Sequence, residues 1–538
     1  MKRFSTLRSW SLLFVLAVFF TCIYAYTLDT KLDLNGDNAT YITLAHRLAE
    51  GHGYTMTTPE GIKPASHFPV GYSAILSIFI RMGLDDLVFF KWLNAIFMFL
   101  SIALLYWLLQ VQTKQNYLAF GIAALSLASP HLLHFAGMAM SEMSYMFCVT
   151  GAMGAMYMYA RKEEKDNQTP FYKNIWFYLS IISAAGAYYI RSVGTSIIFA
   201  LLVFYLFRKE WWQALCSLAG VIMLVAPWMI RNASYGIKSR YFGTIMVVNP
   251  WRPEEGGVQS FGDLWHKMLV NIDETVIKGF REVLFPFWQA SYEPSTVWGI
   301  IVGLVIVAII IWGAWNIKTW RWMMLAFLAA NIGIFALWHG GNGSRYVTPI
   351  IPMLYICFYY GIFTIISAII KKVFTLLHHQ TYDIPEHTLW PILLLLLFIP
   401  LRTPLKMQHE ISRRPYPAAY KNYFQLAKQM NKNLPEGTFV FCRKAELFSY
   451  YAPKLYTACY KFDIDPLAVI QDMVNRKADY VILEQLGYSS TPRYLYPAIR
   501  QYPQLFPVVQ HLPNPDTYLL KFNREQAINL LSNINNHD

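Results

Sequence analysis

Charged residues are scarce in this sequence of 538 residues. Asp, Glu, Lys and Arg together make up 14% of the chain, whereas 55% of it is hydrophobic and 17% is aromatic. A soluble domain usually carries about a quarter charged residues, so this composition excludes an ordinary soluble protein. The apolar residues also come in runs of about 20, which is the length that crosses a bilayer as a helix. The chain is therefore predicted to be a mainly α-helical, polytopic membrane protein.

Cysteine is scarce as well, and its spacing does not indicate a structural zinc centre. The six cysteines form no CxxC or His/Cys pattern typical of such a site. Four of them lie in apolar runs, where a thiol acts as a small buried apolar group: Cys22, Cys148, Cys216 and Cys357. Cys442 and Cys459 lie in the C-terminal region, which would face an oxidising compartment if it is exterior. We predict a disulfide between Cys442 and Cys459.

Internal repeats and low-complexity tracts are absent from the sequence, so an inverted-repeat transporter has no support from it. The formal net charge of +13 could indicate nucleic-acid binding. Most lysines and arginines, however, lie in short connections beside apolar runs, as the positive-inside rule predicts for a membrane protein. We expect membrane lipids, and no nucleic acid, as partners.

The apolar runs predict about 11 membrane spans. The first follows Lys2, Arg3 and Arg8 and has no evident cleavage site, so it is interpreted as a retained signal anchor. The predicted spans cover residues 9–28, 86–110, 117–134, 143–160, 175–190, 193–207, 213–230, 296–316, 322–338, 346–370 and 388–402.

The distribution of basic residues predicts the orientation. With the N-terminus inside, the short inner segments hold fourteen Lys and Arg residues, and the short outer turns hold only Arg191 and Arg345. The N-terminus is therefore expected in the cytoplasm and the C-terminal region outside, in an inner (plasma) membrane. Lys91 lies inside the second span near its outer end, where we expect it to snorkel to the headgroups.

Two domains are predicted. Residues 1–402 form the membrane domain, with large outer loops at 29–85 and 231–295, and residues 403–538 form a small exterior α/β domain. In that domain, residues 438–442, 478–483 and 517–522 have the pattern of strands, and residues 418–430 and 466–474 have helical periodicity.

The first outer loop is rich in ionisable residues and is too long for a simple connection. Tyr41, Leu44, Ala45 and Leu48 share one helical face, which predicts an amphipathic helix in the membrane interface. Asp37 stands at its start, where helix N-termini favour a carboxylate. Spacing alone leaves two interpretations open: a helix cap or a catalytic acid. A second short helix is expected between His67 and Gly83.

Several short motifs occur in a particular order along the chain. The first outer loop contains Asp37, Tyr41, Ala45, Leu48, Gly51 and Gly53, followed by Pro69, Gly71, Tyr72 and Gly83. Later come Ser141-Glu142, Arg191-Ser-Val-Gly194, Pro227-Trp-Met-Ile-Arg231-Asn232 and Arg345-Tyr346-Val-Thr-Pro349-Ile-Ile-Pro352. This combination resembles the GT-C superfamily of membrane glycosyltransferases, in particular the bacterial protein O-mannosyltransferase and aminoarabinose transferase group. The resemblance covers about residues 9–370.

The resemblance implies an inverting transferase that takes a sugar from a polyprenyl-phosphate donor at the outer face. The acceptor would be a hydroxyl or phosphate of a lipid, glycan or protein. Asp37 would be the general base, and Glu142 a second catalytic acidic residue in the same cavity. Substrate contacts would come from Tyr41, His67, Tyr72, Arg191, Arg231, Arg345 and Tyr346. Arg345 also follows a glycine-rich stretch, residues 339–343, which could form an anion-binding nest.

One departure concerns the donor. Parts of the group carry Glu-Lys-Pro where this chain has His67-Phe68-Pro69, so the lysine that meets the donor phosphate is missing. The contact would have to come from Lys63, Arg81, Arg191, Arg231 or Arg345, and an aminoarabinose donor is in doubt. No spacing is diagnostic of a metal site, so none is predicted, although a divalent cation stays open.

Two other functions remain open from the sequence. A transporter or flippase of lipid-linked saccharides would explain the spans, but not the long first loop or the exterior domain. A membrane scaffold with an exterior binding domain would explain both parts without chemistry.

Overall fold

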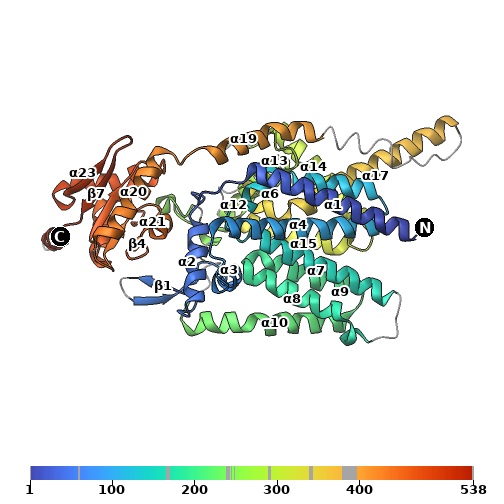
Figure 1. Cartoon of the computed structure of the whole chain (residues 1–538), viewed down its shortest axis with the longest axis horizontal. Helices are drawn as coiled ribbons and strands as arrows, with labels where there is room; N and C mark the ends of the chain where they lie inside the picture. The colour runs from blue at the N-terminus through green and yellow to red at the C-terminus, as the bar shows by residue number, and fades with distance from the viewer. Residues whose placement is uncertain are drawn as a thin grey trace.

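The computed structural model describes residues 2–58, 61–164, 170–237, 243, 245–247, 249–288, 293–338, 343–378 and 397–535. The chain forms a bundle of long apolar helices beside a smaller domain that contains a β-sheet. Figure 1 shows the two parts side by side, with helices α2 and α3 of the first outer loop at the junction between them. The fold class predicted from the sequence, mainly helical with a small α/β domain, is found.

Helices stand at the first ten predicted spans. They are α1 (Lys2–Thr27), α4 (Leu87–Thr113), α5 (Asn116–Leu127) with α6 (Pro130–Ala136), α7 (Glu142–Glu163), α8 (Ile175–Ile190), α9 (Thr195–Phe207), α10 (Trp211–Ser234), α14 (Val297–Asn316), α15 (Arg321–Leu337) and α17 (Ile351–His378). The last is preceded by the short α16 (Gly343–Val347) and η5 (Thr348–Ile350). Most of the eleventh predicted span, residues 388–396, lies outside the described residues.

The described helices differ in length. Five of them are long and apolar enough to cross a membrane, or six if α5 and α6, which meet at a bend of 54°, form one span. Helices α8, α9 and α15 are apolar but shorter. The positions of the predicted helices are therefore confirmed, whereas the count of about 11 spans stays a prediction.

The first outer loop folds into two helices and a hairpin. Helix α2 spans Asp37–Ala49 and α3 spans Gly71–Arg81, where the amphipathic patterns predicted helices. Between them, β1 (Thr55–Thr58) pairs antiparallel with β2 (Gly61–Pro64), a hairpin that the sequence analysis did not predict. Most of α2 is buried, because it packs on α3 and on the C-terminal domain.

Lys91 does not snorkel, contrary to our prediction. Its side chain is buried, and its Nζ donates hydrogen bonds to the backbone carbonyls of Asp29, at 2.6 Å, and Lys31, at 2.5 Å. A buried ammonium is stabilised only if its donors find acceptors. These two carbonyls supply them, so Lys91 holds the start of the first outer loop against α4 rather than reaching the headgroups.

The second outer loop also contains helices. After η3 (Pro253–Glu255), α12 (Phe261–Ile272) continues through a π-helical stretch, η4 (Asp273–Lys278), into α13 (Gly279–Leu284). At the other end of this loop, the carboxylate of Glu254 accepts from Tyr494 at 2.8 Å and pairs with Arg493 at 2.5 Å. The loop is thereby tied to the C-terminal domain.

The C-terminal domain is built around a five-stranded sheet in the order β4-β3-β5-β7-β6. Strand β3 (Phe439–Phe441) runs parallel to β4 (Tyr456–Ala458) and to β5 (Tyr480–Leu483). Strand β7 (Thr517–Lys521) is antiparallel to β5 and to β6 (Val508–Leu512). Strands β3, β5 and β7 were predicted, whereas β4 and β6 were not.

The helices of this domain begin close to where periodicity placed them. Helix α19 (Arg402–Arg413) leads from the bundle to α20 (Ala418–Asn433), and α22 (Pro466–Asn475) follows β4. The shorter helices are α21 (Ala445–Tyr451), η7 (Thr491–Leu495), α23 (Tyr496–Gln501) and η8 (Pro503–Leu505), and α24 (Arg524–Asn535) ends the described chain.

The predicted disulfide is wrong for this structure: Cys442 and Cys459 are both free thiols. They directly follow the parallel strands β3 and β4, whose register aligns Phe441 with Ala458. Side chains of aligned residues on parallel strands run alongside each other at the strand spacing of about 4.8 Å. A disulfide needs its Cβ atoms to converge to about 3.8 Å. Proximity in the sheet therefore does not by itself produce the bond.

Candidate active site

Asp37 is the first residue of α2, and its side chain does not cap that helix. The N-cap position belongs to Gly36, whose φ of +101° is in the left-handed region that favours glycine. The backbone N–H of Asp37 lies 3.5 Å from the Oδ1 of Asn35, so the preceding turn is closed by Asn35. The carboxylate of Asp37 is left free to face across the site. Of the two interpretations open from the sequence, the structure rules out the helix cap.

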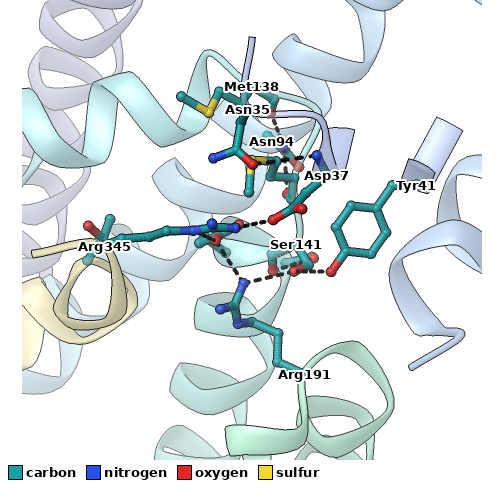
Figure 2. A network of polar contacts seen from close by, with 12 residues as sticks. Asn35, Asp37, Tyr41, Asn94, Met138, Ser141, Arg191 and Arg345 are labelled. Atoms are coloured by element: carbon teal, nitrogen blue, oxygen red, sulfur yellow. Dashed lines mark hydrogen bonds and ion pairs between the residues drawn. The ribbon is translucent and has the colours of Figure 1, made fainter. Parts of the chain in front are cut away.

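The partner of that carboxylate is Arg345. Its Nη2 donates to the Oδ2 of Asp37 in a short ion pair, although the two residues are 308 positions apart. Figure 2 shows the guanidinium reaching from α16 toward the start of α2. Both side chains are partly exposed, at 24% for Arg345 and 28% for Asp37. A solute arriving at this face can therefore reach the pair.

Glu142 lies behind the pair and is fully buried. Its Oε1 is 2.7 Å from the Nη1 of Arg191 and 3.8 Å from the Nε of Arg345. Two guanidinium groups and two carboxylates thus form one cluster with no net charge: Asp37, Glu142, Arg191 and Arg345. A carboxylate buried in this way is stabilised by its cations. Glu142 thus contacts both guanidiniums from the buried side of the cluster.

Tyr41 lies one turn along α2 from Asp37 and joins the cluster through Ser141. Its hydroxyl is 3.0 Å from the Oγ of Ser141, which also accepts a hydrogen bond from Arg191 at 3.1 Å. Burial raises the pKa of Tyr41, so the phenol stays protonated. The Tyr41 ring stacks on Phe68 at 4.4 Å and meets Tyr72 edge-on at 5.1 Å. The aromatic wall therefore fixes one side of the site.

His67 stands next to this wall, with its ring edge-on to that of Phe68 at 4.4 Å. Tyr346 points the other way: its ring stacks on Phe335 of α15 at 6.0 Å, inside the bundle. Tyr72 is fully buried, and burial raises the pKa of its hydroxyl. Of these three predicted contact residues, His67 and Tyr72 lie on the first-loop side of the cluster.

Arg231 is not part of the cluster. Its Nη2 donates to the carbonyl of Tyr54 at 2.7 Å and its Nη1 to the carbonyl of Ala65 at 3.1 Å. The guanidinium also lies over the ring of Trp228, 4.9 Å from the centroid. These contacts tie the hairpin β1–β2 to the end of α10. Arg81 is engaged similarly, since it donates to the carbonyls of Leu48 and Ala49 at the end of α2.

One residue that supports the site, Asn94, was missed by the sequence analysis. Asn94 of α4 donates to the carbonyls of Met138, at 2.6 Å, and Met140, at 3.0 Å, just before Ser141 and Glu142 (Figure 2). A polar residue inside an apolar span is the signal that could have found it. Ser141 was part of a recognised motif, but its link between Tyr41 and Arg191 depends on distant parts of the chain.

In the described part of the chain, no group of three or more His, Cys, Asp or Glu is placed to hold a metal ion. Most of the glycine-rich stretch predicted as an anion nest, residues 339–342, lies outside the described residues. Among the residues that the structure describes, the basic groups of the cluster are the guanidiniums of Arg191 and Arg345.

Comparisons with known proteins concern the fold and one part of the chain. The family model of dolichyl-phosphate-mannose-protein mannosyltransferases matches residues 14–235, a range that contains Asp37, Glu142 and Arg191. A search of curated protein sequences found no match.

Several solved structures are similar over most of the chain, among them two with a bound lipid phosphate. ArnT from Cupriavidus metallidurans, bound to undecaprenyl phosphate, matches 94% of this chain and 97% of its own, with a TM-score of 0.55 and 13% identity. The oligosaccharyltransferase AglB from Archaeoglobus fulgidus, in complex with an inhibitory peptide and a dolichol-phosphate, matches 89% and 69%, with a TM-score of 0.56 and 12% identity. At such identities the likeness is one of fold.

Proposed function

We propose that this chain, whose fold is that of the GT-C membrane glycosyltransferases, is an inverting glycosyltransferase of the cell envelope. It would move a sugar from a polyprenyl-phosphate donor to a hydroxyl or phosphate of a lipid, glycan or protein at the outer face of the membrane. The observation that carries this proposal is the accessible Asp37–Arg345 pair, backed by the buried Glu142 and Arg191.

The phosphate of the donor would compete with Asp37 for binding to Arg345. Among the basic residues considered from the sequence, Arg81 and Arg231 are occupied by backbone carbonyls, whereas Arg191 and Arg345 lie in the cluster. A guanidinium can bind a phosphate through two parallel hydrogen bonds. Transfer of Arg345 from Asp37 to the phosphate would hold the donor and release the carboxylate at once. Arg345 of α16 would thus bind the phosphate in place of the lysine that is missing before Pro69.

With a hydroxyl acceptor, the chemical step balances with these groups. Asp37 accepts the proton of the acceptor hydroxyl. At the same time, the hydroxyl oxygen bonds to the anomeric carbon from the face opposite the phosphate. The bond between that carbon and the phosphate oxygen breaks, and the configuration inverts. The leaving polyprenyl phosphate gains negative charge, which the guanidiniums of Arg345 and Arg191 offset. Glu142 contributes by holding both guanidiniums in place.

The test replaces the proposed base. Asp37→Asn keeps the shape and removes the proton acceptor, so we expect sugar transfer to fall about 10²–10⁴-fold. The assay supplies purified protein with radiolabelled undecaprenyl-phosphate mannose, glucose or arabinose and an envelope extract as the acceptor source, and measures labelled product and free undecaprenyl phosphate. Asp85→Asn is the matched control, because this exposed carboxylate of the same loop pairs with His46 outside the cluster.

Three outcomes decide the proposal. Transfer by the wild-type protein, lost in Asp37→Asn and kept in Asp85→Asn, supports it. Transfer that survives in Asp37→Asn removes Asp37 from the role of base. Movement of the intact labelled donor across proteoliposomes, without cleavage of its sugar–phosphate bond, would overturn the enzyme in favour of a flippase.

A further inference from the structure

The segment that delivers Asp37 to the site has no regular structure of its own. Residues 28–36, here called the approach segment, connect α1 to α2 without forming a helix or strand. Such a segment can take many conformations unless outside contacts fix it. The position of Asp37 therefore depends on what holds the approach segment.

Lys91 of α4 holds the start of this segment, and the region after the membrane bundle contacts it from Lys31 onward. The Nζ of Lys31 donates to the carbonyl of Ser412 at 2.8 Å, and the hydroxyl of Tyr416 donates to the carbonyl of Leu32 at 2.8 Å. Both contacts join residues more than 380 positions apart, so they bring the C-terminal region onto the first outer loop.

The last contact before Asp37 comes from Lys444. Its Nζ donates to the carbonyl of Asn35 at 2.6 Å, one residue before the left-handed Gly36. The side chains of Lys444 and Glu446 both lie against Gly36, where an added Cβ would be 3.7 Å and 3.6 Å from their terminal atoms. Lys444 is itself fixed by the domain core, because its carbonyl accepts from Tyr423 at 3.1 Å and its ammonium lies over the ring of Tyr488.

We infer that Lys444 is a positioning residue for Asp37, and that through it the C-terminal domain sets the geometry of the active site. The hydrogen bond from the ammonium of Lys444 to the carbonyl of Asn35 fixes the turn that immediately precedes α2. Asn35 closes that turn by accepting from the N–H of Asp37, so the constraint passes directly to the proposed base. This inference rests on the proposed catalytic role of Asp37.

The decisive experiment measures order and catalysis separately in the full-length protein. Lys444→Met keeps the length of the side chain and removes the donor, whereas Lys444→Arg keeps a donor. Lys421→Met is the matched control, since Lys421 is exposed on α20 of the same domain. Hydrogen–deuterium exchange followed by mass spectrometry reports on peptides that cover residues 31–41, and it needs no substrate. The transfer assay with the radiolabelled undecaprenyl-phosphate sugars gives kcat and KM.

We expect exchange at residues 31–41 to rise about tenfold in Lys444→Met, because a hydrogen bond to a charged donor is lost. We expect kcat to fall about 10- to 100-fold with little change in the donor KM, as a misplaced catalytic group produces. Lys444→Arg should restore most of both, and Lys421→Met should match the wild type.

Unchanged exchange in Lys444→Met would overturn the inference, and so would a faster exchange with an unaltered kcat. Exchange that rises throughout the C-terminal domain would also count against it, because the substitution would then have unfolded the domain. If the wild-type protein transferred no sugar at all, the proposed function would fail. The exchange result would still show whether Lys444 orders the approach segment.

Discussion

The buried carboxylate of Glu142 allows the cluster to be tested through stability as well as activity. Replacing it by Gln keeps the volume and removes the charge that faces Arg191 at 2.7 Å and Arg345 at 3.8 Å. At an effective dielectric constant of about 20, these contacts correspond to Coulomb energies of about 6 and 4 kcal/mol. The cost of desolvation offsets much of this, and breaking a buried pair typically costs about 3–5 kcal/mol. We expect Glu142→Gln to lose that amount of stability.

The matched control is Glu50→Gln, because Glu50 is 58% exposed in its pair with His52 and such a surface pair contributes about 0–1 kcal/mol. Thermal unfolding in detergent, followed by size-exclusion chromatography, should place the Glu142→Gln midpoint about 3–10 °C below the wild type. The control should stay within about 2 °C of it.

A double variant tests the reasoning further. Removing Arg191 as well, in Glu142→Gln/Arg191→Gln, eliminates the uncompensated guanidinium. The double variant should therefore lose about 1–3 kcal/mol less stability than the sum of the losses in the two single variants. Additive effects, or a Glu142→Gln variant as stable as the wild type, would refute the view that Glu142 holds the arginines through charge.

Two further predictions follow from contacts outside the cluster. Arg231→Ala should increase proteolysis of the first-loop hairpin and lower kcat less than tenfold, because Arg231 holds the carbonyls of Tyr54 and Ala65 and does not touch Asp37; a loss as large as that of Asp37→Asn would contradict this. Burial raises the pKa of Cys459 to about 12, so at pH 8 only about one thiol in 10⁴ is ionised. Iodoacetamide labelling of the native protein, read by mass spectrometry, should therefore be slow at pH 8 and rise about tenfold per pH unit below the pKa. Rapid labelling at pH 8 would show that the thiol is not buried.

Hydropathy was sufficient to place the helices of the bundle. Apolar runs of membrane length mark them directly, and the periodicity of the first outer loop marked α2 and α3. The resemblance to GT-C transferases, drawn from motifs that are individually short, is confirmed by the family match and by the fold of the solved structures. Local patterns were thus sufficient to predict the helices, because the position of each helix depends on the residues within it.

The pairings inside the site could not be obtained in the same way. Asp37 and Arg345 are 308 positions apart, and no local pattern indicates which arginine meets which carboxylate. Lys91 was misplaced because its acceptors are backbone carbonyls of another segment, which carry no signal in the sequence. Strand β4 was missed because its three residues are only partly buried and form no apolar run, unlike the fully buried β3. The hairpin β1–β2 was missed because its strands are mostly exposed and carry no apolar pattern.

The C-terminal contacts on the approach segment form late in the synthesis of the protein. Lys31 and Leu32 leave the ribosome early, whereas their partners Ser412 and Tyr416 are synthesised some 380 residues later and Lys444 follows them. The loop that carries Asp37 is therefore made long before its C-terminal contacts, although Lys91 can already hold its start. A chain that ends before Ser412 would contain every member of the Asp37 cluster but would lack the C-terminal contacts on the approach segment. Under the proposed function, completion of the C-terminal domain would supply the last contacts that position Asp37.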